Sequence, residues 1–281
     1  MLKDLHIQIL AWYARRRQSP LPEVAPTRLS RIGTLWIGDE LPRFHRTCLR
    51  SWLRHGYEVD VFTYGSVEGI PEGCQIRDAG EIAPIDYFGP LTSPEVQRPP
   101  MISDLFRQKL LLRGQHVWVD TDYFMLRPFP DPRTILIGRE PSGPVCSAVL
   151  WIRPESGISQ KILQAYEHRT LAPWSHTRVF TRRLANLFKK QPWSILDYPM
   201  HHYGRHALDF AVEVHRLEGE VLPPKAFYAE VAYDDRLTRA GEPFQPLLDD
   251  PRIHGIHFFW KNEERIAQAE PGSFFDWAKA Q

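Results

Sequence analysis

Two aspartates one residue apart, Asp120 and Asp122, are the side chains of this chain best placed to do chemistry. They follow a short apolar run, 117–119, which is typical of a buried strand. If the strand continues through them, both carboxylates lie on one face, roughly 6–7 Å apart. Such a pair suits a hard divalent ion, Mg²⁺ or Mn²⁺, which often arrives bridging a substrate's phosphates. A solvated turn is the alternative, but ligands of α/β sheets bind beyond the carboxyl ends of strands, which favours the metal.

A second polar pair, Asp104 and Arg107, precedes these aspartates on a segment whose apolar spacing predicts a helix over 101–113. Residues three apart share one helical face. The pair could be a surface ion pair of little energetic weight. It could equally face the cleft of the aspartates, where Asp104 would accept hydrogen bonds from sugar hydroxyls. Arg107 would then make fork-like contacts to phosphate or hydroxyl oxygens.

The elements that must position these residues indicate a parallel α/β sheet. A strand over 32–37, a helix that stops at Gly56 and a strand over 57–64 form one βαβ unit with a right-handed crossover. The Pro-rich segment 89–100 is expected to be a functional loop, and the prolines of 127–132 take the chain out of the sheet. Further strands are expected over 117–120, 135–138, 145–152 and 253–260, and helices over 158–168, 178–190 and 206–215.

Composition excludes several classes of protein. The chain has 281 residues, and its 35 basic and 34 acidic residues argue against a nucleic-acid binder. Three cysteines without a CxxC pair indicate a reducing compartment, so a cytoplasmic, bacterial-type enzyme is expected. No apolar run is long enough to span a membrane. The apolar segment 1–17 lacks the order of a secretory signal, and it is either docked on the domain or an interfacial helix on acidic lipid at the inner membrane.

The central motifs resemble a known family. The order Ser103-Asp104-x-x-Arg107, then Asp120-x-Asp122 and Arg127-Pro128, is similar to the DxD-containing sugar-transferase family. That family includes bacterial capsule and lipopolysaccharide glycosyltransferases and yeast mannosyltransferases, and the large clostridial toxin glucosyltransferases carry a similar signature. The resemblance spans about residues 31 to 260. It also includes Leu35 to Gly38, Cys48 to Ser51, His55 to Val59, Thr63-Tyr64, Gly204 to Leu208, and His257 near Trp260.

The resemblance implies an α/β fold of GT-A type. This fold is a single Rossmann-like nucleotide-binding mixed sheet flanked by helices, with a more helical C-terminal acceptor half. The whole chain, 1–281, is then one domain. It divides into an N-terminal extension over 1–29, a nucleotide-sugar-binding half over 30–152 and an acceptor-side half over 153–281.

The resemblance also implies an activity, which is retaining transfer of a hexose from a nucleotide-diphospho-sugar, with UDP favoured. The acceptor would be a hydroxyl of a saccharide or lipid-linked acceptor in bacterial surface polysaccharide synthesis, and the cofactor Mn²⁺ or Mg²⁺. Asp122 would be the main metal ligand, and Asp120 would contact the ribose, the donor sugar or the metal. Asp104 and Arg107 would hold the donor sugar, and Trp36, Ile37 and Tyr64 would lie near the nucleoside. His257 would be a further metal ligand, and Lys261 would contact the diphosphate.

Some residues depart from the family pattern, and other functions stay open. Members usually carry two glycines where this chain has Gly114-Gln115, and an asparagine where it has Cys146 to Ala148. The histidine-rich stretch 201–206 is expected to be a loop and helix start near the acceptor cleft, not a metal cluster. One rival function is a metal-dependent phosphohydrolase or nucleotidyltransferase that uses the same aspartates. Another is a nucleotide-sugar-binding protein that has lost catalysis. His257 could instead be a histidine of the core, and Lys261 a solvated lysine.

Overall fold

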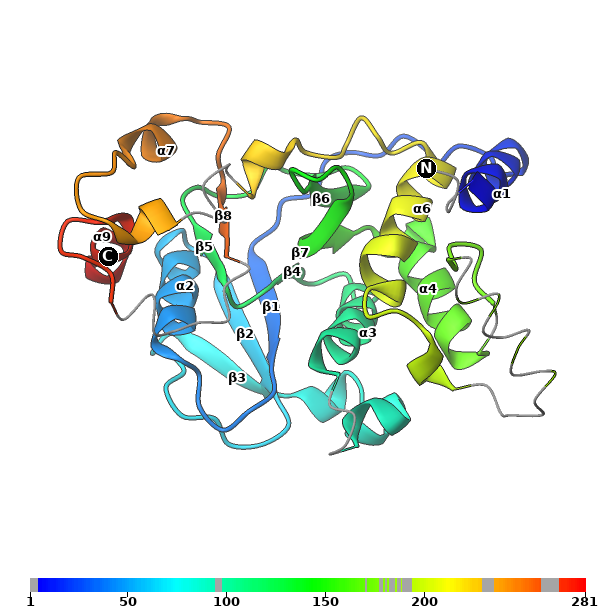
Figure 1. Cartoon of the computed structure of the whole chain (residues 1–281), viewed down its shortest axis with the longest axis horizontal. Helices are drawn as coiled ribbons and strands as arrows, with labels where there is room; N and C mark the ends of the chain where they lie inside the picture. Colours follow the sequence, from blue (N-terminus) through cyan, green and yellow to red (C-terminus); the bar gives the residue numbers. More distant parts are fainter. Residues whose placement is uncertain are drawn as a thin grey trace.

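A six-stranded mixed sheet forms the centre of the computed structural model (Figure 1). The structure describes residues 5–93, 98–169, 171–176, 179, 181, 185, 188, 194–228, 235–258 and 268–281. The strand order is β3 (Cys74–Asp78), β2 (Glu58–Thr63), β1 (Arg31–Trp36), β4 (Val117–Val119), β7 (Val145–Ile152) and β6 (Ile135–Arg139). β3, β2, β1 and β4 run parallel, whereas β7 is antiparallel to both β4 and β6. The carboxyl ends of the four parallel strands therefore meet at one edge.

Two helices sandwich the parallel part of the sheet. α2 (Arg43–Arg54) and α3 (Pro99–Leu111) lie on opposite sides of the strands (Figure 1). α2 buries Phe44, Cys48 and Trp52, which recur every four residues as one helical face. α3 buries residues on several faces because it packs on β1, β4 and β7 and is covered in turn by α4 (Ile158–Glu167). This double cover holds the polar residues of α3 in the interior.

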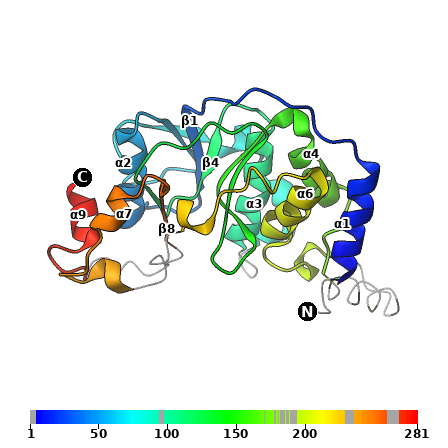
Figure 2. The same ribbon diagram turned by 90° about the horizontal axis from the view of Figure 1, so that it is seen from above.

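The remaining helices extend the molecule on either side of this sandwich. α4 and α6 (Ala207–His215) lie beyond α3, and α1 (Leu5–Arg17) packs on α6 at one end (Figures 1 and 2). α9 (Phe274–Ala280) lies at the opposite end, with α7 (Gln245–Asp249) nearby. No helix among the described segments is long and apolar enough to cross a membrane. Short 3-10 and π-helical turns cover Ala79–Glu81, Ile85–Thr92, Pro154–Ser156, Ile195–Asp197, His202–His206, Pro224–Ala226 and Asp235–Thr238.

A separate two-stranded ribbon joins the sheet to the C-terminal end. β5 (Tyr123–Met125) pairs antiparallel with β8 (Gly255–His257). One face of the ribbon packs in a second core, in which Phe124 and Ile256 lie with Phe44 of α2 and Phe274 of α9. Tyr123 and Met125 of β5 belong to the core of the main sheet. Two hydrogen bonds tie it to α2, from Trp52 Nε1 to the Tyr123 carbonyl at 2.8 Å and from the Met125 amide to Ser51 Oγ at 2.9 Å. The ribbon is thus held against α2.

The expected fold class is confirmed, because the chain forms a mixed α/β sheet flanked by helices, consistent with the GT-A type. Several expected elements differ. The segment 89–100 is not a plain loop, since a 3-10 helix occupies Ile85–Thr92 and α3 already begins at Pro99. The strand expected over 253–260 is limited to Gly255–His257, and residues 259–260 lie outside the described residues. Most of the helix expected over 178–190 lies outside them too.

Candidate active site

Asp120 and Asp122 come together through a turn and not through strand alternation. β4 ends at Val119, and the Tyr123 amide donates to the Asp120 carbonyl at 3.0 Å, which closes a turn over 120–123. The expectation that both side chains share a strand face was therefore wrong, because the strand has already ended. The Asp120 amide still donates to the Ala148 carbonyl of β7 at 2.7 Å, so the turn is anchored to the sheet.

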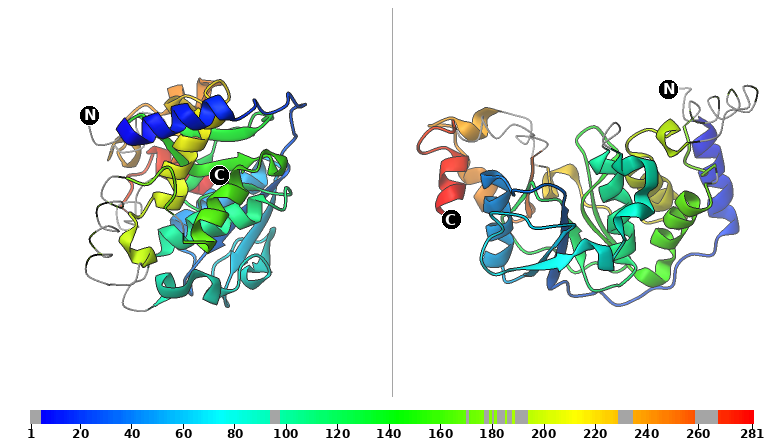
Figure 3. Two further views of the ribbon diagram at one scale, coloured as in Figure 1. Left: turned by 90° about the vertical axis from the view of Figure 1, so that its right-hand side faces the viewer. Right: turned by 90° about the horizontal axis from the view of Figure 1, so that it is seen from below.

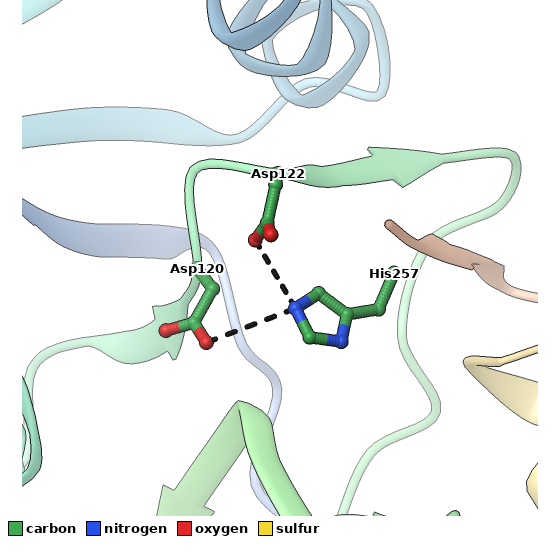
Figure 4. Close-up of side chains that lie close together, drawn as sticks. All are labelled: Asp120, Asp122 and His257. Carbon is green, nitrogen blue, oxygen red and sulfur yellow. Dashed lines mark hydrogen bonds and ion pairs between the residues drawn. The ribbon is translucent and has the colours of Figure 1, made fainter. Parts of the chain in front are cut away.

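His257 reaches the same point from the far end of the chain. β8 pairs with β5 so that His257 stands opposite Tyr123, and the Phe258 amide donates to the Asp122 carbonyl at 2.9 Å. The imidazole Nε2 lies 3.1 Å from Asp122 Oδ1 and 3.9 Å from Asp120 Oδ2 (Figure 4). One possible ligand atom from each of the three residues lies within 4.8 Å of the others. In the part of the chain that the structure describes, this is the one such group of metal-ligating side chains.

The chemistry of this cluster fits a divalent cation. Burial disfavours a charged imidazole, but Asp122 and, to a smaller extent, Cys146 together outweigh it and raise the pKa of His257 well above its ordinary value. The side chains of Asp120 and Asp122 are 27% and 23% exposed, so a cation held between them would remain open to a substrate. Two carboxylates and one imidazole supply the oxygen and nitrogen ligands that divalent cations take in proteins.

Asp104 and Arg107 face this cluster from α3 and are not a surface ion pair. Each side chain is 5% exposed, and Arg107 Nη2 lies 3.5 Å from Asp104 Oδ1 and 3.4 Å from Asp120 Oδ1. Arg107 also donates from Nη1 to the Ser147 carbonyl at 2.5 Å and from Nε to the Ser103 carbonyl at 3.2 Å. One guanidinium therefore links the helix, the strand β7 and the turn that carries the aspartates.

Burial makes the charged form of the Asp104 carboxylate unfavourable. Burial raises its pKa to about 7, Arg107 counteracts this rise, and the neighbouring Asp120 reinforces it. Gly204, in the π-helical turn His202–His206, lies directly against it, so a Cβ atom at Gly204 would collide with both carboxylate oxygens. The stretch 201–206 thus closes over Asp104, and a glycine is needed there for space.

Two aromatic residues that the sequence analysis did not single out support the site. Trp118 donates from Nε1 to Asp120 Oδ1 at 2.6 Å, and the Arg107 guanidinium lies 4.8 Å from its ring centroid. Tyr228 packs its ring edge-on against His257 at 5.8 Å. Trp118 stands two residues before Asp120, so its position in the sequence could have indicated a contact with that aspartate. Tyr228 carried none, because only the folded chain brings it to β8.

The other predicted donor-binding residues stay predictions. Trp36 and Tyr64 lie at the carboxyl ends of β1 and β2, on the same sheet edge as Asp120. The Trp36 ring packs on His45 at 5.0 Å, the Tyr64 hydroxyl donates to the Ala83 carbonyl at 2.7 Å, and Ile37 is 41% exposed. Lys261 lies outside the described residues.

Comparisons with known proteins add little to this geometry. No protein-family model matches the chain, and no curated protein matches it. Among solved structures, the chain is similar to a protein named "PaToxG Glycosyltransferase" at 14% identity. The match covers 76% of this chain and 94% of that chain, with a TM-score of 0.34. At this level of similarity, the function has to be inferred from the site itself.

Proposed function

We propose that this chain is a glycosyltransferase that depends on a divalent metal and transfers a hexose from a nucleotide-diphospho-sugar to an acceptor hydroxyl. The observation that carries the proposal is the convergence of Asp120, Asp122 and His257, with one ligand atom from each within 4.8 Å of the others. The buried Asp104–Arg107 pair contacts that cluster directly through Asp120. The sequence resemblance to DxD sugar transferases supports the same assignment.

Each group has a chemical role in this proposal. Asp120, Asp122 and His257 would hold Mn²⁺ or Mg²⁺, which neutralises charge on the nucleoside diphosphate as that group departs. Asp104 accepts hydrogen bonds from hydroxyls of the donor sugar, and Arg107 fixes Asp104 and Asp120 relative to one another. These two residues hold the sugar in a reactive orientation. Trp36, Ile37 and Tyr64 stand at the sheet edge where the nucleoside would lie, with Lys261 proposed for the diphosphate.

We further propose that the anomeric configuration is retained, which rests on the family resemblance. In such a reaction the acceptor hydroxyl attacks the sugar from the face that the diphosphate leaves. The departing phosphate oxygen can take the hydroxyl's proton, so no protein base is required. The acceptor is expected to be a saccharide or a lipid-linked oligosaccharide of a bacterial surface polymer, and the nucleotide is expected to be UDP.

The test is release of nucleoside diphosphate by the purified chain with Mn²⁺, over a panel of UDP- and GDP-sugars, with an EDTA control. Release from one donor that stops with EDTA is expected. Asp122→Asn should abolish this release, because it removes a charged ligand at the cluster. Asp86→Asn, which changes an exposed aspartate in the 3-10 helix Ile85–Thr92, is the matched control and should leave it unchanged.

Three results would contradict the proposal. The first is wild-type release from folded Asp122→Asn protein. The second is release of inorganic phosphate in place of nucleoside diphosphate, which would identify a phosphohydrolase. The third is donor binding, seen as a rise in melting temperature, with no metal-dependent cleavage of any donor. That last result would identify a nucleotide-sugar-binding protein.

A further inference from the structure

Helix α1 carries an unusual share of the exposed apolar side chains. Of the large hydrophobic residues that are exposed in the described structure, five lie on this helix. They are Leu5 at 49% exposure, Ile9 at 56%, Leu10 at 42%, Trp12 at 52% and Tyr13 at 47%. Scattered single hydrophobic residues on a surface are ordinary, but a cluster on one element indicates an interaction surface.

The helix is docked on the domain through its opposite face. Ala11 is fully buried, and α1 packs on α6. At the two ends of that contact, His6 Nε2 lies 2.8 Å from the Ser175 carbonyl and Gln18 Nε2 lies 3.0 Å from His215 Nδ1. Figure 3 (left) looks onto the end of the molecule that α1 forms. The docked position expected for this segment is therefore observed, and it does not account for the outward apolar residues.

Helical spacing aligns those outward residues into a stripe. Leu5, Ile9 and Trp12 follow one another at intervals of four and three residues, so they share one face. Residues 7, 11 and 14 have the same spacing, lie on the opposite side of the helix and are buried or half-buried. The helix is consequently apolar on two opposite faces. A surface helix that only packs on its own domain needs one apolar face, so the second face is suited to contact with a partner.

The charge of α1 indicates what that partner is. Residues 5–17 contain no aspartate or glutamate and end in Arg15, Arg16 and Arg17. Arg15 lies 3.9 Å from Glu218, whereas the guanidinium of Arg16 lies over the Trp12 ring at 4.1 Å and that of Arg17 over the Tyr13 ring at 4.2 Å. Tryptophan, tyrosine and arginine side by side match the headgroup layer of a bilayer, where amphipathic rings settle and cations meet anionic lipid.

We propose that the outward face of α1, comprising Leu5, Ile9, Trp12 and Tyr13 with Arg16 and Arg17, docks the protein on an anionic lipid surface. Its apolar surface continues through Leu10 and Tyr13 into a cavity of about 530 Å³ between α1, α4 and α6. The helix lies in the plane of the interface and does not cross it, which agrees with its 13 residues. A second copy of the chain would bury the apolar stripe but would bring two arginine clusters together, so the lipid surface fits the charge better.

The experiment is sedimentation of the full chain with vesicles of phosphatidylcholine mixed with phosphatidylglycerol, and with phosphatidylcholine alone. Binding is expected to the mixed vesicles and to weaken with salt. Arg16→Gln with Arg17→Gln should weaken binding about fivefold for each arginine removed. Ile9→Ser with Trp12→Ser should abolish it. Ile76→Ser, which changes a residue of β3 that is 59% exposed, is the matched apolar control and should bind as the wild type does.

Circular dichroism and release of nucleoside diphosphate should be unchanged in these variants, since each altered side chain is exposed and none contributes to the candidate site. Failure of the wild-type protein to bind mixed vesicles would overturn the proposal. Equal binding by the Ile9→Ser, Trp12→Ser protein would also overturn it. So would a dimer, seen by sedimentation velocity without vesicles, that dissociates on those two substitutions, because a second copy would then cover the stripe.

Discussion

Replacing Asp104 with asparagine is expected to stabilise the fold at neutral and alkaline pH while removing donor turnover. Burial raises the pKa of this carboxyl from 3.8 to about 7, against the opposing effect of Arg107. In the unfolded chain the pKa returns to its ordinary value. Between these two pKa values the folded state therefore holds a proton that the unfolded state has released. The free energy of unfolding consequently falls as pH rises through this window, and the loss is complete above pH 7.

The magnitude follows from the same shift. The difference between a pKa of 3.8 and one of about 7 corresponds to about 4 kcal/mol as an upper value. Asparagine keeps the shape of the side chain and cannot ionise. Arg107 would not be left unpaired, because it retains Asp120 and the carbonyls of Ser103 and Ser147. The stabilisation by Asp104→Asn should thus be about 3 kcal/mol larger at pH 8 than at pH 5.

The assay is urea unfolding followed by circular dichroism at pH 5 and pH 8, with EDTA present so that metal binding does not contribute. Asp86→Asn is the control for replacement of an exposed carboxylate and should show no such pH dependence. An equal effect of Asp104→Asn at both pH values would refute the electrostatic reasoning. Release of nucleoside diphosphate at the wild-type rate would refute the role of Asp104 in holding the sugar.

Three further predictions concern the residues around the site. His257→Ala should raise the Mn²⁺ concentration for half-maximal donor cleavage at least tenfold in a Mn²⁺ titration. In the wild type, Mn²⁺ binding should weaken as pH falls, because the raised pKa of His257 means that its proton must leave before the metal binds. Gly204→Ala should lower turnover by about 100-fold and also lower the melting temperature, because the added Cβ displaces the buried Asp104; unchanged kinetics would contradict the contact. Trp52→Phe should lower the free energy of unfolding by about 1–3 kcal/mol in urea, because it leaves the Tyr123 carbonyl of β5 without its donor.

The sequence predicted five of the six strands of the central sheet, all except the edge strand β3, and the site residues of α3, because their signals are local. The apolar periodicity of α2 and the β-rich runs of β1 and β2 lie within short windows, and the structure has them within a residue or two of the expected bounds. Asp104 and Arg107 are three residues apart on one helix, so their common face follows from helical geometry alone. Their burial does not follow, because the turn at Gly204 and the Ser147 carbonyl of β7 meet them from elsewhere in the chain.

The three-residue ribbon strands β5 and β8 show where sequence reasoning stops. Each is too short to give a period, and 129 residues separate Met125 from Gly255 in the chain. His257 could be suggested for the metal only through a family resemblance. The register that sets it opposite Tyr123 depends on packing between Phe124, Ile256 and Phe274, all of which are long-range contacts.

The candidate metal cluster lies between two hydrophobic cores, because its ligands come from the main sheet and from the ribbon of β5 and β8. Val119 and Tyr123, which flank the turn that carries Asp120 and Asp122, belong to the core of the main sheet, whereas Phe258, next to His257, belongs to the second core with α9. The spacing of the three ligand atoms therefore depends on how the ribbon is held against the sandwich. Trp52 and Ser51 provide that hold through their bonds to Tyr123 and Met125. A substitution in α2, without contact to any ligand, should for this reason alter metal affinity as well as stability.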